Sequence, residues 1–275
     1  SDGIKSLLAM SKEPVYDSRM EELTFGKEVE NLEITLHQHA LTITDSLDDQ
    51  IHISYHPSLS AHHDLVTNQN DKTLSLTDKK LSETPFLSSG IGGILHIASS
   101  YSSRFNEVIL QLPKGRSLKG INVSANRGQT SITNASLENA TLNTNSYILR
   151  IKGSRIKNSK LTTPNIVNIF DTDLTDSQLE STEKHFRAEN IKVYGKVELS
   201  SKNALSIMLT QKESQEINLD LSSHHGPIYQ LSRDESQRHP NELSNPYKTE
   251  KTDAKGQLIA KADDYISLET AANRP

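Results

Sequence analysis

The middle of the chain contains the stretch Ile132-Thr-Asn-Ala-Ser-Leu137-Glu-Asn-Ala-Thr-Leu142. The same pattern returns twice and is followed by a weaker copy: Ile151-Lys-Gly-Ser-Arg-Ile156-Lys-Asn-Ser-Lys-Leu161, Ile169-Phe-Asp-Thr-Asp-Leu174-Thr-Asp-Ser-Gln-Leu179 and Phe186-Arg-Ala-Glu-Asn-Ile191. The first apolar residues of the four copies, at 132, 151, 169 and 186, are 19, 18 and 17 residues apart. A period of this length indicates a stack of similar structural units, each lying on the one before it.

Each unit is predicted to be one coil of β-structure. Residues two apart in a strand share a face, so Ala135 points with Leu137 and Ala140 with Leu142. The large residues are five apart, an odd number, and the chain must therefore turn between them for both to face inward. Small inward residues are expected beside each corner, namely Ala135, Ser154, Thr172, Ala140, Ser159 and Ser177. Turn-forming residues fall in register as Asn134, Gly153 and Asp171, and again as Asn139, Asn158 and Asp176.

Two other repeat architectures fit less well. A helical repeat is disfavoured because the units are rich in Thr, Ser, Asn and β-branched residues, and apolar spacing of five traces no helical stripe. An antiparallel sandwich would not keep three positions in register over successive units. The sequence therefore predicts an all-β fold, a single parallel β-solenoid (β-helix) with coils of 17–19 residues and capping segments at both ends. Right-handed coils are expected, since parallel crossovers are right-handed in about 98% of cases.

The remaining segments are assigned around this repeat, which is clearest over 118–200. Residues 1–29 are expected to be an N-terminal linker or cap, and 30–275 a single solenoid domain. Within it, a Ser- and Gly-rich side insertion is predicted at 78–104 and a polar loop at 232–256. Closing strands are predicted at 258–268, because a solenoid needs its last pairing edge covered.

The composition agrees with a thin structure and excludes several classes of protein. Only 33% of residues are hydrophobic and 5% aromatic, Trp is absent, and the net charge is −5. With a pI near 6.1 and no basic stripe, no nucleic-acid partner is expected. The absence of Cys excludes disulfides and thiolate metal sites. Because the chain begins at Ser1 and has no apolar run of membrane-spanning length, we expect any signal peptide or anchor upstream.

Several stretches, in their order along the chain, resemble the bacterial putative-adhesin family. They are Leu32-Glu-Ile34, Leu41-Thr-Ile43, Ile51-His-Ile53-Ser-Tyr55, Leu74-Ser-Leu76, Val108-Ile-Leu-Gln-Leu-Pro113, Leu118-Lys-Gly-Ile121-Asn-Val123 and Asn218-Leu-Asp-Leu221-Ser-Ser-His-His-Gly226-Pro-Ile228. The resemblance covers about 30–268. The Gly-Asp-Ile or Gly-Asn-Val steps common in the family are approached only by Gly226-Pro-Ile228 and Gly195-Lys-Val197. The resemblance implies a surface-exposed β-helix domain of unknown function, commonly joined to a membrane anchor and without established catalysis.

Two groups of side chains could carry chemistry, and both are given a structural interpretation. Asp171 and Asp173 share a strand face and lie near Asp176, but two of the three coincide with turn positions. His37 and His39 also share a face, but a zinc ion needs three or four ligands, so we expect surface histidines. The adjacent pairs at 62–63 and 224–225 are interpreted in the same way. No catalytic, cofactor-binding or metal site is predicted, and the protein is not expected to be an enzyme.

The sequence therefore favours a non-catalytic, adhesin-like interaction module on the extracellular face of the bacterial envelope. Its partner would be a surface protein, a cell-wall polymer or a host ligand, and any membrane contact would pass through an anchor outside this sequence. One alternative is a structural scaffold that polymerises end to end. A less favoured one is a polysaccharide-processing β-helix enzyme, which would need a groove of converging carboxylates.

Overall fold

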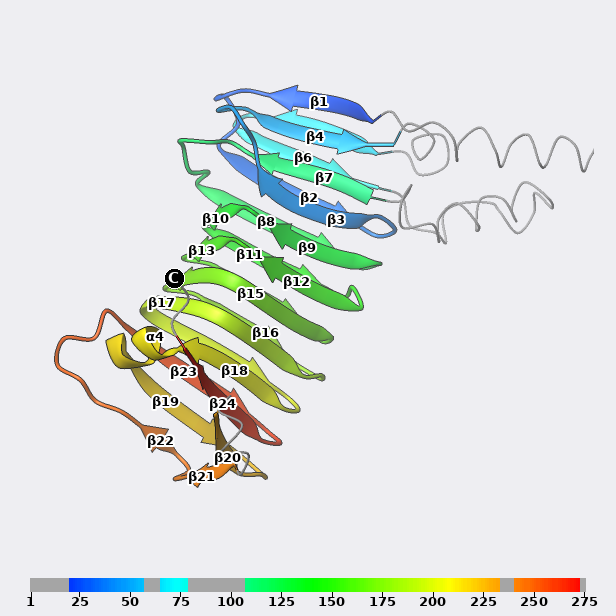
Figure 1. The fold of residues 1–275 in the computed structure, drawn as a ribbon. Coiled ribbons are helices and arrows are strands. Elements are labelled where there is room, and N and C mark those ends of the chain that lie inside the picture. The colour runs from blue at the N-terminus through cyan, green and yellow to red at the C-terminus, as the bar shows by residue number, and fades with distance from the viewer. Residues whose placement is uncertain (1–19, 57–64, 79–106, 233–239, 273–275) are drawn as a thin grey trace, which may run out of the picture. The chain divides into compact units, whose positions relative to one another are not determined.

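The computed structural model describes residues 20–56, 65–78, 107–232 and 240–272, and the chain divides into two compact units, 1–130 and 131–275 (Figure 1). The predicted side insertion lies outside the described residues except for Asp78. Apart from one short helix, the regular structure of the described part consists of β-strands. The all-β prediction is therefore confirmed.

The repeats of unit 131–275 form short strands that stack in parallel. Leu137 lies opposite Ile156, which lies opposite Leu174, and all three are buried. On the next sheet Leu142, Leu161 and Leu179 are aligned in the same way. The strands are β10 (Ser136–Glu138), β11 (Ala140–Thr144), β12 (Ile148–Lys152), β13 (Arg155–Lys157), β14 (Lys160–Thr163), β15 (Ile166–Thr175), β16 (Gln178–Ser181) and β17 (Phe186–Ser201), preceded by β9 (Gln129–Thr133).

The predicted corner residues adopt the left-handed backbone conformation that a sharp turn requires. The φ angles of Asn134, Asn139, Asn158, Asp171 and Asp176 lie between 45° and 59°, and Gly153 has φ of 60°. The next coil continues both columns with Asn190 and Gly195. At Gly195 an added Cβ would lie 2.0 Å from Asp176 Oδ1, which also accepts a hydrogen bond from the Lys196 amide at 3.0 Å. The turn assignment, including that of Asp171 and Asp176, is confirmed.

The small serine residues at the corners also make hydrogen bonds to the main chain. Ser154 Oγ donates to the Lys152 carbonyl at 2.9 Å and accepts from the Ala135 amide at 3.2 Å. Ser159 Oγ does the same with the Lys157 carbonyl and the Ala140 amide. Because buried backbone groups must be hydrogen-bonded, these hydroxyls satisfy amides that the bent strands leave unpaired at each corner.

The C-terminal strands insert into the stack instead of closing it. The segments after the repeat are β18 (Leu205–Thr210), α4 (Gln211–Glu216), β19 (Ile217–Ser223), β20 (Ile228–Ser232), β21 (Asn241–Leu243), β22 (Tyr247–Lys248), β23 (Gly256–Ala262) and β24 (Ile266–Ala271). β23 lies between β17 and β19, and β24 lies between β18 and β20 (Figure 1). The outer edges of β19 and β20 are instead covered by β22 and β21, which form part of the predicted polar loop 232–256.

Unit 1–130 shows the same kind of insertion at the other end of the sequence. Its strands are β1 (Glu21–Phe25), β2 (Asn31–Leu36), β3 (Ala40–Asp45), β4 (Ile51–Tyr55), β5 (Val66–Asn70), β6 (Thr73–Thr77), β7 (Glu107–Leu112) and β8 (Gly120–Ala125). β2 lies between β6 and β8, parallel to both. β1, within the predicted N-terminal linker or cap, pairs antiparallel with β4.

The prediction of one wholly parallel solenoid is not confirmed, because the sheet is mixed. Antiparallel pairs join β1 to β4, β4 to β7, β5 to β6, β19 to β22 and β20 to β21. For β5 and β6 the antiparallel pairing follows from the connection between them. It consists only of Asp71 and Lys72, and so short a connection permits only an antiparallel pair. Coil handedness stays a prediction. In the described part of the chain no helix has the length and apolar character needed to cross a membrane.

Candidate functional site

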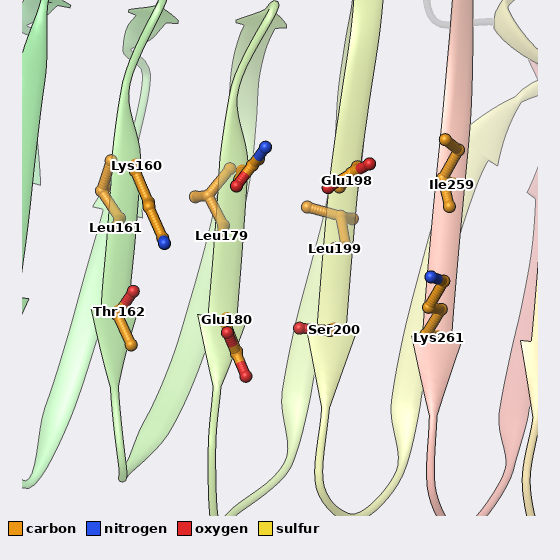
Figure 2. Close-up of a pocket in the computed structure, with 11 residues that line it drawn as sticks. Lys160, Leu161, Thr162, Leu179, Glu180, Glu198, Leu199, Ser200, Ile259 and Lys261 are labelled. Atoms are coloured by element: carbon orange, nitrogen blue, oxygen red, sulfur yellow. The ribbon is translucent and has the colours of Figure 1, made fainter.

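The outer surface of β14, β16, β17 and β23, here called the B face, is polar and regular (Figure 2). The alternate residues Leu161, Leu179, Leu199 and Ala260 are buried, so their neighbours must point outward. The outward residues form two rows in register across the four strands: Lys160, Gln178, Glu198 and Ile259 in one, and Thr162, Glu180, Ser200 and Lys261 in the other.

The B face offers donors and acceptors at a fixed spacing. Neighbouring strands lie about 4.8 Å apart, so each row presents one polar group at nearly that interval, with Ile259 as the apolar exception. Two Lys and two Glu are distributed over the rows, and Lys196 Nζ lies 3.6 Å from Glu198 Oε1. The side chains of the two rows line a shallow hollow of about 160 Å³. The arrangement suits a polar ligand that lies across the strands.

The B face carries two carboxylates. Glu180 and Glu198 lie on adjacent strands and in different rows. Figure 2 shows the Glu180 side chain directed away from Glu198. Two carboxyl groups act together on a glycosidic bond only when both face the same bond.

The acidic residues considered from sequence do not converge either. Asp171 and Asp176 occupy the corners described above, and Asp173 lies on β15 opposite Arg155 of β13. Among the residues that the structure describes, no three His, Asp or Glu side chains gather in a way that could hold a metal ion.

The prediction of surface histidines is wrong for His39. Its side chain is fully buried, and Nδ1 lies 2.6 Å from Asp78 Oδ2. The same carboxylate accepts the amides of His37 at 2.6 Å and Gln38 at 3.0 Å, so it caps the turn between β2 and β3. This pair could not be predicted from the sequence, because Asp78 follows a different strand 39 residues further along.

The pKa of Asp78 reflects two opposing effects. Burial disfavours the charged carboxylate and would raise the pKa. The hydrogen bond from His39 and those from the backbone amides of His37 and Gln38 favour the charged form and outweigh it, so the pKa lies below its ordinary value. Asp78 is therefore a structural anion.

Among the other histidines that the structure describes, His56 is buried as well, with 3% of its surface exposed. His224 and His225 are exposed as predicted, with ring centroids 4.1 Å apart and the rings edge to face. The pair at 62–63 lies outside the described residues. His52, which the sequence did not single out, is mostly covered, with 12% of its side chain exposed.

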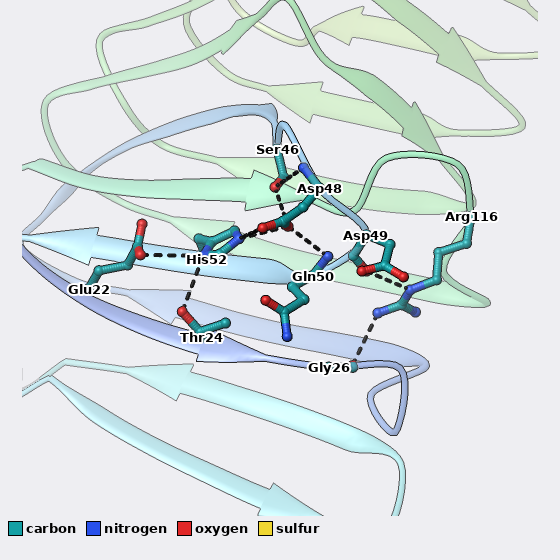
Figure 3. Close-up of polar contacts among 9 residues, drawn as sticks. All are labelled: Glu22, Thr24, Gly26, Ser46, Asp48, Asp49, Gln50, His52 and Arg116. Carbon is teal, nitrogen blue, oxygen red and sulfur yellow. Dashed lines mark hydrogen bonds and ion pairs between the residues drawn. The ribbon is translucent and has the colours of Figure 1, made fainter.

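His52 joins strand β1 to the turn before β4 (Figure 3). Its Nε2 lies 2.8 Å from Asp48 Oδ1, and its Nδ1 lies 3.1 Å from Thr24 Oγ1 and 3.4 Å from Glu22 Oε2. A hydroxyl, an imidazole and a carboxylate in this order resemble a nucleophile with its base and orienting acid. Here the Glu22 carboxylate competes for the same ring nitrogen as Thr24, which makes the cluster a structural link between strands.

Arg116 fixes the neighbouring turn through backbone carbonyls. Its guanidinium donates to the carbonyl oxygens of Asp49 and Gly26 (Figure 3), and also to that of Val29, each at 3.1 Å. Three charge-assisted hydrogen bonds to the main chain hold the turn without requiring a ligand.

We expect Asp48 to titrate at unusually low pH. Hydrogen bonds from His52, the Gln50 amide and Ser46 lower its pKa to about 2. Since the unfolded-state pKa is about 3.9, this carboxylate stabilises the fold above about pH 4 and loses that contribution as the pH falls towards 2. Carboxyl-carbon NMR titration should give a midpoint near 2, and His52→Gln should shift the midpoint upward. An unchanged midpoint in the variant would show that His52 is not the main cause.

Comparison with known proteins places this architecture in a family. The model of the Toastrack DUF4097 family matches residues 29–269. The chain belongs to the Toastrack DUF4097 family. This Toastrack match extends over both compact units and confirms the resemblance seen in the sequence. No curated protein matches the chain.

Solved structures similar to this Toastrack chain share little sequence with it. A "putative cell adhesion protein" from Clostridium sporogenes has a TM-score of 0.34 and 12% identity, covering 92% of this chain and 100% of its own. A "putative adhesin" from Bacteroides fragilis has a TM-score of 0.43 and 12% identity, covering 93% and 98%. A "putative lipid binding protein" from Parabacteroides distasonis has a TM-score of 0.37 and 11% identity, with the same coverage of 93% and 98%.

Proposed function

We propose that the protein is a non-catalytic, adhesin-like interaction module of the bacterial cell envelope that binds a polar ligand through the B face. The observation that carries the proposal is the regular double row of polar side chains around the B-face hollow. A rigid sheet presents such groups without the ordering cost that a mobile loop would add to binding.

The chemistry of the B face favours a hydroxylated or zwitterionic envelope component over a strongly charged one. Lys160 and Lys261 stand among Glu180 and Glu198, so neither sign of charge dominates the surface. Thr162, Gln178 and Ser200 supply neutral donors and acceptors between them. Cell-wall polymers carry such groups at regular intervals, which is the property that a row of side chains at strand spacing can match.

The extracellular location is part of the same proposal. It is supported by the resemblance of the sequence to envelope proteins. The decisive observation would be protease shaving of intact cells that express the full-length protein, with lysed cells as the reference. Cleavage on intact cells is expected, and cleavage only after lysis would overturn the extracellular location.

Reversing the charges of the B face should weaken binding to the envelope. The double variant Glu180→Lys with Lys261→Glu keeps the net charge and should lower the affinity for washed cells of the producing species by at least about 10-fold, because misplaced charges oppose the ligand. Sedimentation of labelled protein with the cells measures this affinity. The matched control is Glu138→Lys with Lys157→Glu on β10 and β13, which exchanges an opposed pair elsewhere and should bind normally.

Two results would contradict the proposed binding surface. Failure of the wild-type protein to sediment with cells would remove the proposed function. Equal loss of binding in both double variants would show a general charge effect unrelated to the B face.

A further inference from the structure

Strand β18 forms the floor of a groove, here called the β18 groove, on the sheet that does not carry the B face. The residues of the floor are Ala204, Ser206 and Met208, of which the first two are small. Met208 points outward but is only 5% exposed, and it lies between Glu189 of β17 and Glu269 of β24. The groove has a volume of about 640 Å³. Sites for small molecules commonly measure about 300–1,000 Å³.

The two walls of the β18 groove bear different kinds of side chain. On the β17 side, Arg187 and Glu189 form an ion pair. They lie beside Ser206 and Met208 in the register of the strands. On the other side, Tyr265 immediately precedes β24 and is 38% exposed. One wall therefore presents a charged pair, and the other presents an aromatic ring.

The strand spacing sets the width and the length of the β18 groove. Both β17 and β24 are direct neighbours of β18, so the backbones of the two walls are about 10 Å apart. From Ala204 to Met208 the floor extends over about 13 Å, at about 3.3 Å per residue. A flat ring standing on edge fits between such walls, and the length admits a short chain of rings.

The β18 groove offers hydrogen-bonding groups beside its aromatic ring. Ser267 Oγ donates to Ser206 Oγ at 3.2 Å, which leaves the hydroxyl hydrogen of Ser206 as a donor. The ion pair of Arg187 with Glu189 adds both N–H donors and carboxylate acceptors. A sugar ring has an apolar C–H face and hydroxyl groups around its edge. It can therefore stack on Tyr265 and use these donors and acceptors at the same time.

The charges of the β18 groove disfavour an anionic ligand. Its carboxylates are those of Glu189, Glu269 and Asp264. Among the described residues that line it, the basic ones are Arg187 and His185, so acids outnumber bases. Like charges would oppose a phosphate, a uronate or a lipid phosphate headgroup. The groove therefore favours an uncharged sugar.

We propose that the β18 groove binds a short neutral saccharide, with one ring stacked on Tyr265 and hydroxyl groups bonded to Ser206 and the Arg187–Glu189 pair. This site is separate from the B face, because it lies on the other sheet and shares no lining residue with the B-face hollow. Binding of a short saccharide can therefore be measured whether or not the B face binds the envelope.

Saturation-transfer difference NMR on the purified full chain tests the proposal with three neutral probes, namely maltotriose, cellotriose and triacetylchitotriose. At least one of them should bind, with a Kd of roughly 0.1–5 mM, because an open groove encloses only part of its ligand. Trigalacturonate should not bind, since its carboxylates would meet those of the groove.

Variants of the groove should weaken binding of the probe that responds. Tyr265→Ala should raise its Kd at least about 10-fold, because the sugar loses the ring on which it stacks. Tyr265→Phe keeps the ring and should lose less. Ser206→Leu should abolish binding, since a larger side chain fills the floor. The matched control is Tyr147→Ala, which removes a 64% exposed ring outside the groove and should bind normally.

A second control, Glu180→Lys with Lys261→Glu on the B face, should also leave trisaccharide binding unchanged. Thermal melting followed by circular dichroism checks that each variant is folded. The proposal would be overturned if none of the neutral probes bound at about 10 mM, a concentration above the expected Kd. Binding that persists in both Tyr265→Ala and Ser206→Leu would also overturn it. So would a preference for trigalacturonate, or loss of binding in the B-face variant.

Discussion

The Asp78→Ala variant is expected to lose about 3–5 kcal/mol of unfolding free energy, the cost of removing a buried carboxylate that accepts several hydrogen bonds. The carboxylate is the shared acceptor for His39 and for the His37 and Gln38 amides, and the side chains of Asp78 and His39 are both fully buried. No water can replace it without entering the turn between β2 and β3. Urea unfolding, followed by circular dichroism, measures the loss.

The stability from Asp78 should also depend on pH in a defined direction. Its pKa is lowered in the folded state, so the unfolded state binds protons more readily as the pH falls. The contribution is complete above the unfolded value of about 4 and disappears as the pH drops through the folded pKa. Wild type and Asp78→Ala should therefore approach each other in stability at acid pH. Asp49→Ala, at a half-exposed ion pair with Lys27, is the control and should cost less than about 1 kcal/mol.

The second large effect is expected at Glu213, on the short helix α4. Glu213 is buried, and Oε1 accepts the Val193 amide at 2.7 Å and Lys255 Nζ at 2.5 Å. Lys255 Nζ also lies 4.0 Å from the centre of the Tyr194 ring. Glu213→Ala should cost about 3–5 kcal/mol, because the amide and the ammonium both lose their acceptor.

Two variants separate the role of the Glu213 charge from that of the helix. Glu213→Gln retains an acceptor oxygen and should lose less than Glu213→Ala. Gln215→Ala, an exposed position on the same helix, should change stability by no more than about 0.5 kcal/mol. A loss below about 1 kcal/mol for Glu213→Ala would mean that water or another group satisfies Lys255 and Val193.

The repeat and its corners could be predicted because they depend on residues close together in sequence. The five-residue spacing of Leu137 and Leu142 requires a turn, and Asn139 supplies it. The same reasoning extends coil by coil as far as Gly195. Inward and outward positions follow from alternation alone, so the part of the B face on β14, β16 and β17 could have been listed residue by residue from the sequence.

The remaining features depend on contacts that sequence spacing does not encode. The pairing of β23 with β17 and β19 joins segments about 60 and 40 residues apart, and nothing local distinguishes an inserted coil from a terminal one. His39 and Asp78 belong to different strands in the same way. Helix α4 has only six residues, too few to show helical periodicity.

The insertion of β23 and β24 has a mechanical consequence. The C-terminal end of the described chain leaves from β24, which is hydrogen-bonded to β18 on one side and β20 on the other, while β23 is held in the same way by β17 and β19. A pull along these strands loads two parallel ladders in shear together, whereas a terminal coil could be peeled from an edge one bond at a time. Such a fold is expected to resist tension applied through the C-terminal end of the described chain.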